Sequence, residues 1–370
     1  MTSDSIPPSY ANQSRDHPVL AITMGDRNGV GPEIILKALS ELKKNNPGVS
    51  FGILLLASRD AMQFYSQLSS SLSGPAFLSV KQDAYSWIYS GEHAYPSNMD
   101  DHPCPDPGEV LLVPCREPQE KIKPGSITAA SGKLAMDAVA AGVNACRTGL
   151  ADAVVTAPVS KEAIHMAGFR VPGHTEFLAQ LTRTDAVGMM LVNRFMRIGL
   201  ATIHIPLGEV AGALSTDLIL SRLELYHRAL RQDFGIANPC IAVLGLNPHA
   251  GDGGVLGSEE QELITPAIEV AKKRNMNIDG PWPADGFFGR RAFERTDLVF
   301  AMYHDQGLIP LKLAGFGSGV NVTVGLPIIR TSPDHGTAFS IAGKNLADPA
   351  SMLAACKLAL EMIERRDKSN

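Results

Sequence analysis

Three histidines occupy the same kind of position in this sequence. Each follows an apolar run typical of a buried strand: His204 closes "LATIH", His249 closes "VLGLNPH" and His304 closes "VFAMYH". If these strands are neighbours in one sheet, the imidazoles meet at one edge, and three protein ligands with open positions form a catalytic divalent-metal site. A lone histidine at a strand end is more often a hydrogen-bonded structural residue, and the wide spacing matches no compact metal motif. The pattern alone leaves both interpretations open.

Two further segments carry residues that could hold an anion. "TAPVSKEAI" predicts a strand-to-helix turn in which Ser160 caps the helix and Lys161 reaches an anionic substrate. "PGHTEFLA" places His174 and Thr175 ahead of an apolar helix face. There Thr175 either caps the helix or joins His174 in a clamp on a phosphate or carboxylate.

Lys312, Asn321 and Arg330 follow His304 on successive segments. Lys312 and Arg330 stand among apolar neighbours, where a cation is costly unless it is paired with an anionic substrate or a structural carboxylate. The glycine-rich stretch "GDRNGVGPE" (25–33) lies between a strand and a helix. It favours either contact with an anion or cofactor, or simply a tight turn, and it is neither GxGxxG nor a P-loop.

The elements that must position these residues alternate along the chain. The predicted strands are 19–25, 51–58, 151–159, 197–205, 240–249, 297–304 and 319–332. The predicted helices are 32–45, 129–149, 217–235 and 348–366, and 95–109 is expected to be an exposed loop. This alternation predicts an α/β protein with mostly parallel sheets and helices on their faces.

Bulk properties narrow the class of protein. A chain of 370 residues suggests about two domains or lobes. The net charge of −5, without a basic stripe, argues against nucleic acid as a partner, and no apolar run is long enough to span a membrane. The polar start lacks a signal core. Five widely spaced cysteines without CxxC indicate a reduced, cytoplasmic protein.

Several long motifs carry a family resemblance: "GHTEFLA", "ATIHIPL", "GLNPHAGDGG", "AMYHDQGLIPLK", "GFGSGVNVTVGLPIIRTSPDHGTA" and "IAGK". From about Val19 to Ile363 the chain resembles the 4-hydroxythreonine-4-phosphate dehydrogenase family. The resemblance implies two α/β/α three-layer lobes of the isocitrate/isopropylmalate dehydrogenase-like type, with the active site in the cleft between them. We expect a disordered lead (1–18), an NAD-side lobe (19–155 with 320–370) and a metal, substrate and dimerisation lobe (156–319).

The resemblance also implies an activity and a set of site residues. It implies NAD-dependent, metal-assisted oxidation and decarboxylation of 4-phosphooxy-L-threonine to 3-amino-2-oxopropyl phosphate, in pyridoxal 5′-phosphate biosynthesis, by a homodimer whose site is shared at the interface. The metal (Zn, Mg or Co) would be held by His204, His249 and His304. The substrate would be bound by His174, Thr175, Lys312, Asn321 and Arg330. The hydroxyl proton has three unranked candidate acceptors, namely Lys161, Asp285 and Asp305.

A second similarity concerns the cofactor. "HGTAFSIAGKNLADPASMLAA" (335–355) is similar to the NAD-binding loop of isopropylmalate and isocitrate dehydrogenases. This implies that NAD, with NADP left open, is bound by His335, Gly336, Thr337, Ala342, Gly343 and Asn345.

Two departures from the family pattern leave the substrate open. Arg27 and Asn28 stand where the family commonly has "GDPAGIGPE", and the 95–125 region is longer than in compact members. Related enzymes act on D-threonate or D-erythronate 4-phosphates, or on dihydrodiol carboxylates from terephthalate. A metal-dependent phosphoester hydrolase is the alternative from another class, and the NAD-like segment argues against it.

Overall fold

The chain divides into two compact units. The computed structural model describes residues 16–45, 50–68, 87–90, 93–96, 104–115, 119–171, 173–315 and 317–367. Unit 1 comprises Met1–Arg183 and Ile328–Ile363, and unit 2 comprises Thr184–Pro327 and Glu364–Asn370. Most of the predicted disordered lead, residues 1–15, lies outside the described residues.

Unit 1 is built on a parallel sheet. Its described strands lie in the order β13 (Ile329–Pro333), β6 (Ala153–Thr156), β1 (Val19–Thr23), β2 (Gly52–Ala57) and β5 (Val110–Pro114). Every residue of β1 and β2 is buried, which explains why "VLAIT" and "GILLLA" are continuous apolar runs and do not alternate with polar residues.

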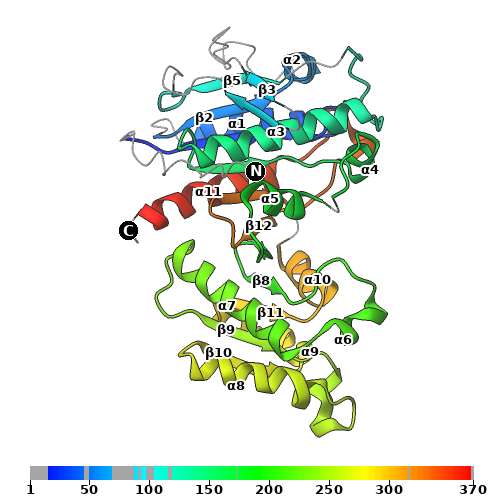
Figure 1. Ribbon diagram of the computed structural model, residues 1–370, viewed down its shortest axis with the longest axis vertical. Coiled ribbons are helices and arrows are strands. Elements are labelled where there is room, and N and C mark those ends of the chain that lie inside the picture. Colours follow the sequence, from blue (N-terminus) through cyan, green and yellow to red (C-terminus); the bar gives the residue numbers. More distant parts are fainter. Residues whose placement is uncertain are drawn as a thin grey trace, which may run out of the picture. The chain divides into compact units, whose positions relative to one another are not determined.

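The helices of unit 1 pack closely on this sheet and on one another. They are α1 (Gly31–Asn45), α2 (Arg59–Leu68), α3 (Ala129–Arg147), α4 (Lys161–Met166), α5 (His174–Thr182) and α11 (Ala350–Asp367), the last of which belongs to unit 1 as far as Ile363. Figure 1 shows α3 lying in front of the strands, with α4 near one of its ends. A Cβ added to Gly132 of α3 would lie 2.1 Å from Ala163 O of α4, so only glycine permits this approach.

Unit 2 contains a mixed sheet. Its order is β10 (Asn277–Trp282), β9 (Cys240–Leu244), β11 (Leu298–Ala301), β8 (Arg197–Leu200), β7 (Gly188–Val192) and β12 (Val320–Val324). The first four strands are mutually parallel, whereas β7 runs antiparallel to both β8 and β12. Its helices are α6 (Val210–Ala213), α7 (Thr216–Gln232), α8 (Thr265–Lys273), α9 (Ala284–Gly289) and α10 (His304–Gly315). Helix α8 packs against both α7 and β10 (Figure 1).

A buried tyrosine fastens α7 to the middle of this sheet. Tyr226 is fully buried, and its hydroxyl accepts a hydrogen bond from Leu200 N at 3.0 Å. The same hydroxyl lies 3.0 Å from the carbonyl oxygens of Met189 and Leu200, to either of which it donates. Burial raises the pKa of Tyr226 to about 12, so the hydroxyl stays protonated. One phenol therefore links α7, β7 and β8.

The α/β class predicted from the sequence is confirmed, with local corrections. The predicted strand 319–332 is wrong, because it consists of two strands, β12 and β13, separated by a turn in which Gly325 has φ +92°. The histidine-tipped strands are shorter than expected, and His304 begins α10. In the predicted loop 95–109, Tyr95 and Pro96 belong to strand β4 (His93–Pro96), which pairs with β3 (Trp87–Ser90), and residues 97–103 lie outside the described residues.

The boundaries between the units fall at different residues from the expected lobe boundaries. The expected boundaries were 155/156 and 319/320, whereas the units divide after Arg183 and after Pro327. Helices α4 and α5 both pack on α3, which places 156–183 in unit 1. Strand β12 pairs with β7, which places it in unit 2.

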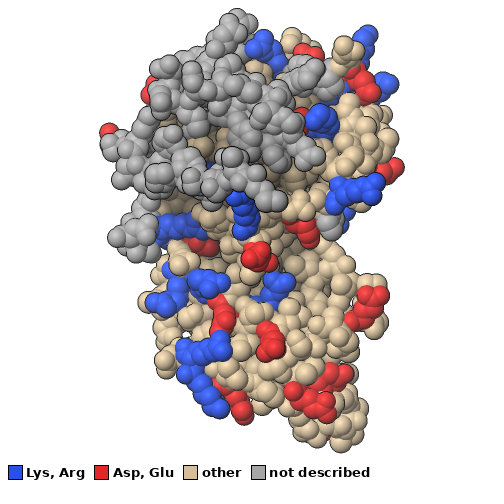
Figure 2. Space-filling view, viewed as in Figure 1, with Lys and Arg blue, Asp and Glu red and all other residues tan. Residues whose placement is uncertain are grey.

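The described surface carries charges of both signs. On the face in Figure 2, Lys and Arg side chains are interspersed with Asp and Glu over unit 2. Among the described helices, each is too short or too polar to cross a lipid bilayer.

Candidate functional site

The three strands that lead to the predicted metal-binding histidines are neighbours in unit 2. β9, β11 and β8 are consecutive and parallel, so their carboxyl ends share one edge of the sheet. Just beyond these ends, the imidazole rings of His204 and His304 lie side by side, with centroids 5.8 Å apart and planes tilted by 40°. The structure therefore brings two of the three histidines together.

The donor chemistry of His304 fits a metal ligand. Its Nδ1 lies 2.7 Å from Asp305 Oδ1. A carboxylate that accepts the Nδ1 proton fixes the tautomer in which Nε2 carries the free lone pair, which is the usual arrangement around a metal-binding histidine. Residues His204 and His304 thus fit a divalent cation, and Asp305 orients the second of them.

His249 is placed differently. It is exposed and lies in a run of left-handed backbone, with φ +55°. Within the part of the chain that the structure describes, no three His, Cys, Asp or Glu side chains are grouped closely enough to hold a metal ion. One copy of the chain therefore presents a histidine pair, and His249 does not complete it.

A second polar centre lies inside unit 1, at the end of β6. Arg330 is 1% exposed, and its Nε and Nη2 donate to Thr156 Oγ1 at 3.2 and 2.7 Å. Its Nη2 also lies 3.3 Å from His174 Nδ1. Burial lowers the pKa of Arg330 to about 9, so the guanidinium remains charged at neutral pH. The site thus holds a buried cation.

The tautomer of His174 follows from this contact. A guanidinium only donates, so Nδ1 must accept and the ring proton must sit on Nε2. Nε2 is buried and has no hydrogen-bond partner among the described residues. Burial, with a smaller contribution from the Arg330 charge, lowers the pKa of His174 to about 3. A neutral imidazole therefore presents an unused N–H donor beside a buried cation, which suits an anionic oxygen.

Lys161 and Thr175 lie near this centre. Ser160 caps α4 by accepting from Ala163 N at 3.2 Å, as the sequence predicted. Exposed Lys161 follows, with its Cε near Gly173 at the start of α5. A capping role for Thr175 is wrong, because the cap position of α5 is Gly173 and no side chain caps it. The substrate-clamp interpretation of Thr175 stays a prediction.

Lys312 and Asn321 belong to unit 2. Lys312 is exposed on α10, so its apolar sequence neighbours do not bury it. Asn321 lies in β12, and its buried Oδ1 accepts no hydrogen bond from the described residues. Asp285, at the start of α9, is also exposed.

The predicted cofactor segment is anchored to the glycine-rich turn. Thr337 O accepts from Val30 N at 2.9 Å, and a Cβ added to Gly29 would lie 2.9 Å from Thr337 O. The segment itself includes left-handed residues, Ala338, Gly343 and Asn345, which give it the shape of a loop. The backbone of the turn therefore lies directly against residues predicted to bind NAD.

The two residues that depart from the family motif are structural in this turn. Arg27 is 1% exposed, and its Nη2 donates to Glu120 O at 2.7 Å. Asn28 Oδ1 accepts from Lys123 N at 3.0 Å. Buried Asp26 accepts from Asn28 N and from Ser131 Oγ. Burial raises the pKa of Asp26, and these hydrogen bonds oppose the rise.

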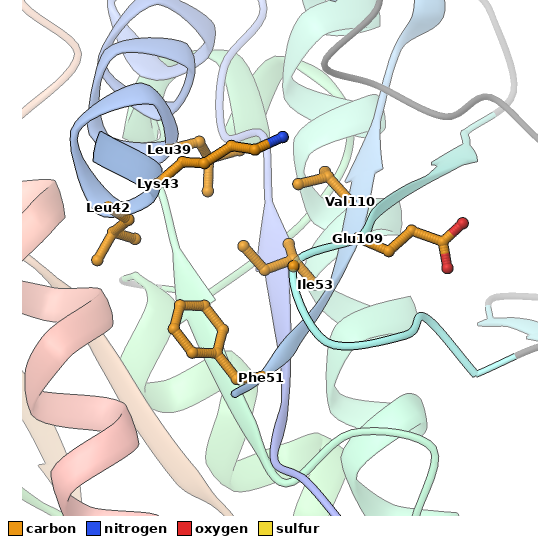
Figure 3. A pocket seen from close by; sticks show the side chains of 8 residues that line it. Leu39, Leu42, Lys43, Phe51, Ile53, Glu109 and Val110 are labelled. Atoms are coloured by element: carbon orange, nitrogen blue, oxygen red, sulfur yellow. The ribbon is translucent and has the colours of Figure 1, made fainter. Parts of the chain in front are cut away.

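Two recesses are present in the described surface, and two lining residues of the second, Pro283 and Gly286, flank the candidate Asp285 in sequence. The first, at the edge of unit 1, is lined mainly by apolar side chains such as Leu39, Phe51 and Ile53, with Lys43 and Glu109 beside it (Figure 3). Its volume of about 20 Å³ holds roughly one water molecule. The second, in unit 2, has about 490 Å³ and is lined by Trp282, Phe287 and three arginines.

The described residues that could do chemistry thus form two groups on an α/β scaffold. One is the buried, positively charged centre of Arg330 and His174, which suits an anion and is called the anion centre below. The other is the histidine pair. Comparison with known proteins assigns the chain to a class: its relatives are dehydrogenases, oxidoreductases that act on a hydroxyl group. The family model "Pyridoxal phosphate biosynthetic protein PdxA" matches residues 59–359. The chain therefore belongs to the PdxA family, which confirms the resemblance seen in the sequence.

Individual relatives support this assignment over nearly the whole chain. The 4-hydroxythreonine-4-phosphate dehydrogenase of Prosthecochloris aestuarii is 40% identical over 349 residues, covering 94% of this chain and 97% of the relative. That of Chromobacterium violaceum is 41% identical over 347 residues, covering 93% and 97%.

Solved structures agree with the sequence relatives. The 4-hydroxythreonine-4-phosphate dehydrogenase of Klebsiella pneumoniae superposes with a TM-score of 0.76 at 35% identity, covering 94% of this chain and 99% of that one. A terephthalate 1,2-cis-dihydrodiol dehydrogenase from Burkholderia xenovorans LB400 gives 0.59 at 28% identity, covering 93% and 98%.

Proposed function

We propose that this protein oxidises the secondary alcohol of 4-phosphooxy-L-threonine with NAD and promotes loss of CO2, giving 3-amino-2-oxopropyl phosphate for pyridoxal 5′-phosphate synthesis. The observation that carries the proposal is the buried anion centre of Arg330 and His174, in a chain whose relatives bear the name of this activity. Burying the Arg330 guanidinium away from water is costly, and a dianionic phosphate or a carboxylate from the substrate would offset that cost.

The chain's own residues divide the work. Arg330 and the Nε2–H of His174 hold an anionic group of the substrate, while Thr156 fixes the guanidinium. Lys312, Asn321 and Thr175 are further proposed substrate contacts. His204, His249 and His304 would hold a divalent metal (Zn, Mg or Co), which when bound lowers the pKa of the substrate hydroxyl and polarises the resulting ketone. The residues that would hold NAD, the hydride acceptor when bound, are His335, Gly336, Thr337, Ala342, Gly343 and Asn345.

A protein group must take the hydroxyl proton as the alcohol becomes a ketone. Asp305 is engaged with His304 Nδ1, which suits it for orienting the imidazole. Lys161 and Asp285 remain as proton acceptors, and Lys161 shares unit 1 with the anion centre. When CO2 leaves, the electron pair of the broken bond moves toward the ketone oxygen, and the carbon that carried the carboxylate is then protonated.

The metal site is proposed to be shared between two copies of the chain. Because the His204 and His304 rings are neighbours, one copy would supply this pair and the other would supply His249. Mixed dimers of His249→Ala and His304→Ala then contain one intact site of two. At random 1:1 mixing, half of the dimers are mixed, so about a quarter of full activity should return.

The control is a mixture of His204→Ala and His304→Ala, in which every site lacks one member of the pair. Recovery in this control, or none in the first mixture once mixed dimers are demonstrated, would contradict the sharing scheme.

The substrate is tested by NADH formation. The assay compares 4-phosphooxy-L-threonine with the unphosphorylated amino acid, D-threonate and D-erythronate 4-phosphates, and a terephthalate-derived dihydrodiol carboxylate. The proposal expects the highest kcat/KM for the first compound, with NAD preferred over NADP. Preference for another acid identifies a paralogue, and release of inorganic phosphate without NADH identifies a hydrolase. None of the five cysteines, all of which lie among the described residues, forms a disulfide, which suits the reducing cytoplasm that we propose as the protein's location.

A further inference from the structure

The backbone that carries His249 adopts an unusual left-handed conformation. Six consecutive residues have positive φ: His249 (55°), Ala250 (52°), Gly251 (81°), Asp252 (45°), Gly253 (67°) and Gly254 (98°). Three of them carry a Cβ, which crowds the following carbonyl in left-handed backbone. Such a run persists only when its surroundings hold it in place, and strained segments of this kind gather at functional sites.

A buried carboxylate holds the start of this run. Glu260 is 3% exposed and begins the single π-helical turn Glu260–Ile264. Its Oε1 accepts from Asn247 N at 2.7 Å, and its Oε2 accepts from Asn247 Nδ2 at 2.9 Å. Both carboxylate oxygens therefore bind the residue two positions before His249.

The same carboxylate packs directly against the backbone of the run. A Cβ added to Gly251 would lie 2.7 Å from Glu260 Oε2, and one added to Gly245 would lie 3.0 Å from Glu260 Oε1. A Cβ on Gly253 would meet nothing within 4 Å. The carboxylate thus fixes the turn on the side of Gly251, whereas the space beside Gly253 is open.

Gln306 joins this loop to the segment that bears His304. Its Nε2 donates to Gly245 O at 2.6 Å, just after β9, and its Oε1 accepts from Met302 N at 2.7 Å, just after β11. One side chain therefore sets the spacing between two of the strand ends that precede the predicted ligands.

We infer that Glu260 is a positioning residue for the metal site, and that it holds the His249 imidazole in its binding orientation through Asn247 and the left-handed turn. This inference rests on the proposed metal-binding function. It assigns a role to a buried carboxylate that is too far along the chain from any histidine to be recognised as part of a ligand motif. Partners that orient metal ligands typically contribute tenfold to a hundredfold in metal affinity.

The test measures binding of Co²⁺ to the full-length protein by competition with a chelator and by visible absorption of the bound ion. Glu260→Gln places an N–H where a carboxylate oxygen accepts from Asn247, so Co²⁺ should bind about tenfold to a hundredfold more weakly. The matched control is Glu262→Gln, the same charge change on an exposed side chain of the same π-helical turn. Equal affinities of the two variants would overturn the inference.

A second pair of variants avoids any loss of charge. Gly251→Ala pushes a methyl group against Glu260, whereas Gly253→Ala carries the same left-handed penalty in open space. Weaker Co²⁺ binding in Gly251→Ala than in Gly253→Ala is expected, and equal weakening counts against the inference even if Glu260→Gln does not fold.

His249→Ala distinguishes failure of the proposed metal site from failure of the positioning role of Glu260. If it binds Co²⁺ as tightly as the unaltered protein, the proposed metal site fails. If it loses Co²⁺ while Glu260→Gln and Gly251→Ala match their controls, only the positioning role fails.

Discussion

Replacing His174 with asparagine removes an imidazole that the fold keeps neutral. Burial and Arg330 lower its pKa to about 3, against roughly 6.5 in an unfolded chain. As pH falls through the pKa of His174 in the unfolded chain, the unfolded state binds a proton, whereas the folded state does not. The free energy of unfolding therefore decreases on acidification, and asparagine abolishes this contribution while its Oδ1 still accepts from Arg330.

The size of the effect follows from the same two pKa values. Between about pH 6.5 and pH 5 the unfolded imidazole titrates over some 1.5 pH units, and each unit corresponds to about 1.4 kcal/mol. The folded group stays neutral throughout this interval, which gives about 2 kcal/mol. His174 taken as a whole residue keeps some contact with solvent, so we expect about 1 to 2 kcal/mol.

Urea unfolding at about pH 7.5 and pH 5 gives the change in the free energy of unfolding between the two pH values. The contribution of His174 is this change in the unaltered protein minus the change in His174→Asn. The unaltered protein should lose about 1 to 2 kcal/mol more stability on acidification than His174→Asn does, because all other titrating groups are common to both. Parallel losses in the two proteins would refute the neutral, buried state of His174 and the tautomer inferred from it.

Three further changes probe the other parts of the site. Arg330→Lys cannot reproduce the two bonds to Thr156, so KM for the phosphorylated substrate should rise about tenfold to a hundredfold in steady-state assays; an unchanged KM would remove Arg330 from the substrate site. Ser131→Ala deprives buried Asp26 of a donor and should lower the urea-derived stability by about 1.5 to 3 kcal/mol, whereas an unchanged midpoint would mean that the bond contributes nothing. His304→Ala should abolish NADH formation with excess metal and leave circular dichroism near that of the unaltered protein; near-normal turnover would exclude it as a ligand.

The sequence predicted the architecture well where burial dictated the pattern. Fully buried strands such as β1 and β2 read as continuous apolar runs, and α3 was recognised within two residues of its ends. Predictions failed where tertiary pairing decided the outcome. Strands β12 and β13 were predicted as one because "VNVTVGLPIIRTS" has a strand-like composition on both sides of Gly325, where a turn divides it.

The site residues were predictable by type but not by environment. The apolar neighbours of Arg330 correctly indicated burial, yet the same argument misplaced Lys312, which faces solvent on a helix. The sequence did not predict the roles of Thr156 and Glu260. Thr156 accepts hydrogen bonds from Arg330, and Glu260 accepts them from Asn247 before the His249 turn, and no sequence motif connects either pair. The left-handed run could have been suspected from the three glycines in "HAGDGG".

The hydrogen bond between the Tyr226 hydroxyl and the Leu200 amide makes that amide a reporter of the opening of unit 2. The Leu200 amide is completely buried, so its hydrogen can exchange with deuterium only through an opening of unit 2 that breaks the bond to Tyr226. The exchange rate at this single amide reports the opening of that unit alone. A slower exchange of the Leu200 amide with divalent cation than without it would show that cation binding near His204 and His304 stabilises the packing of α7 on β8. This measurement does not depend on changes in unit 1.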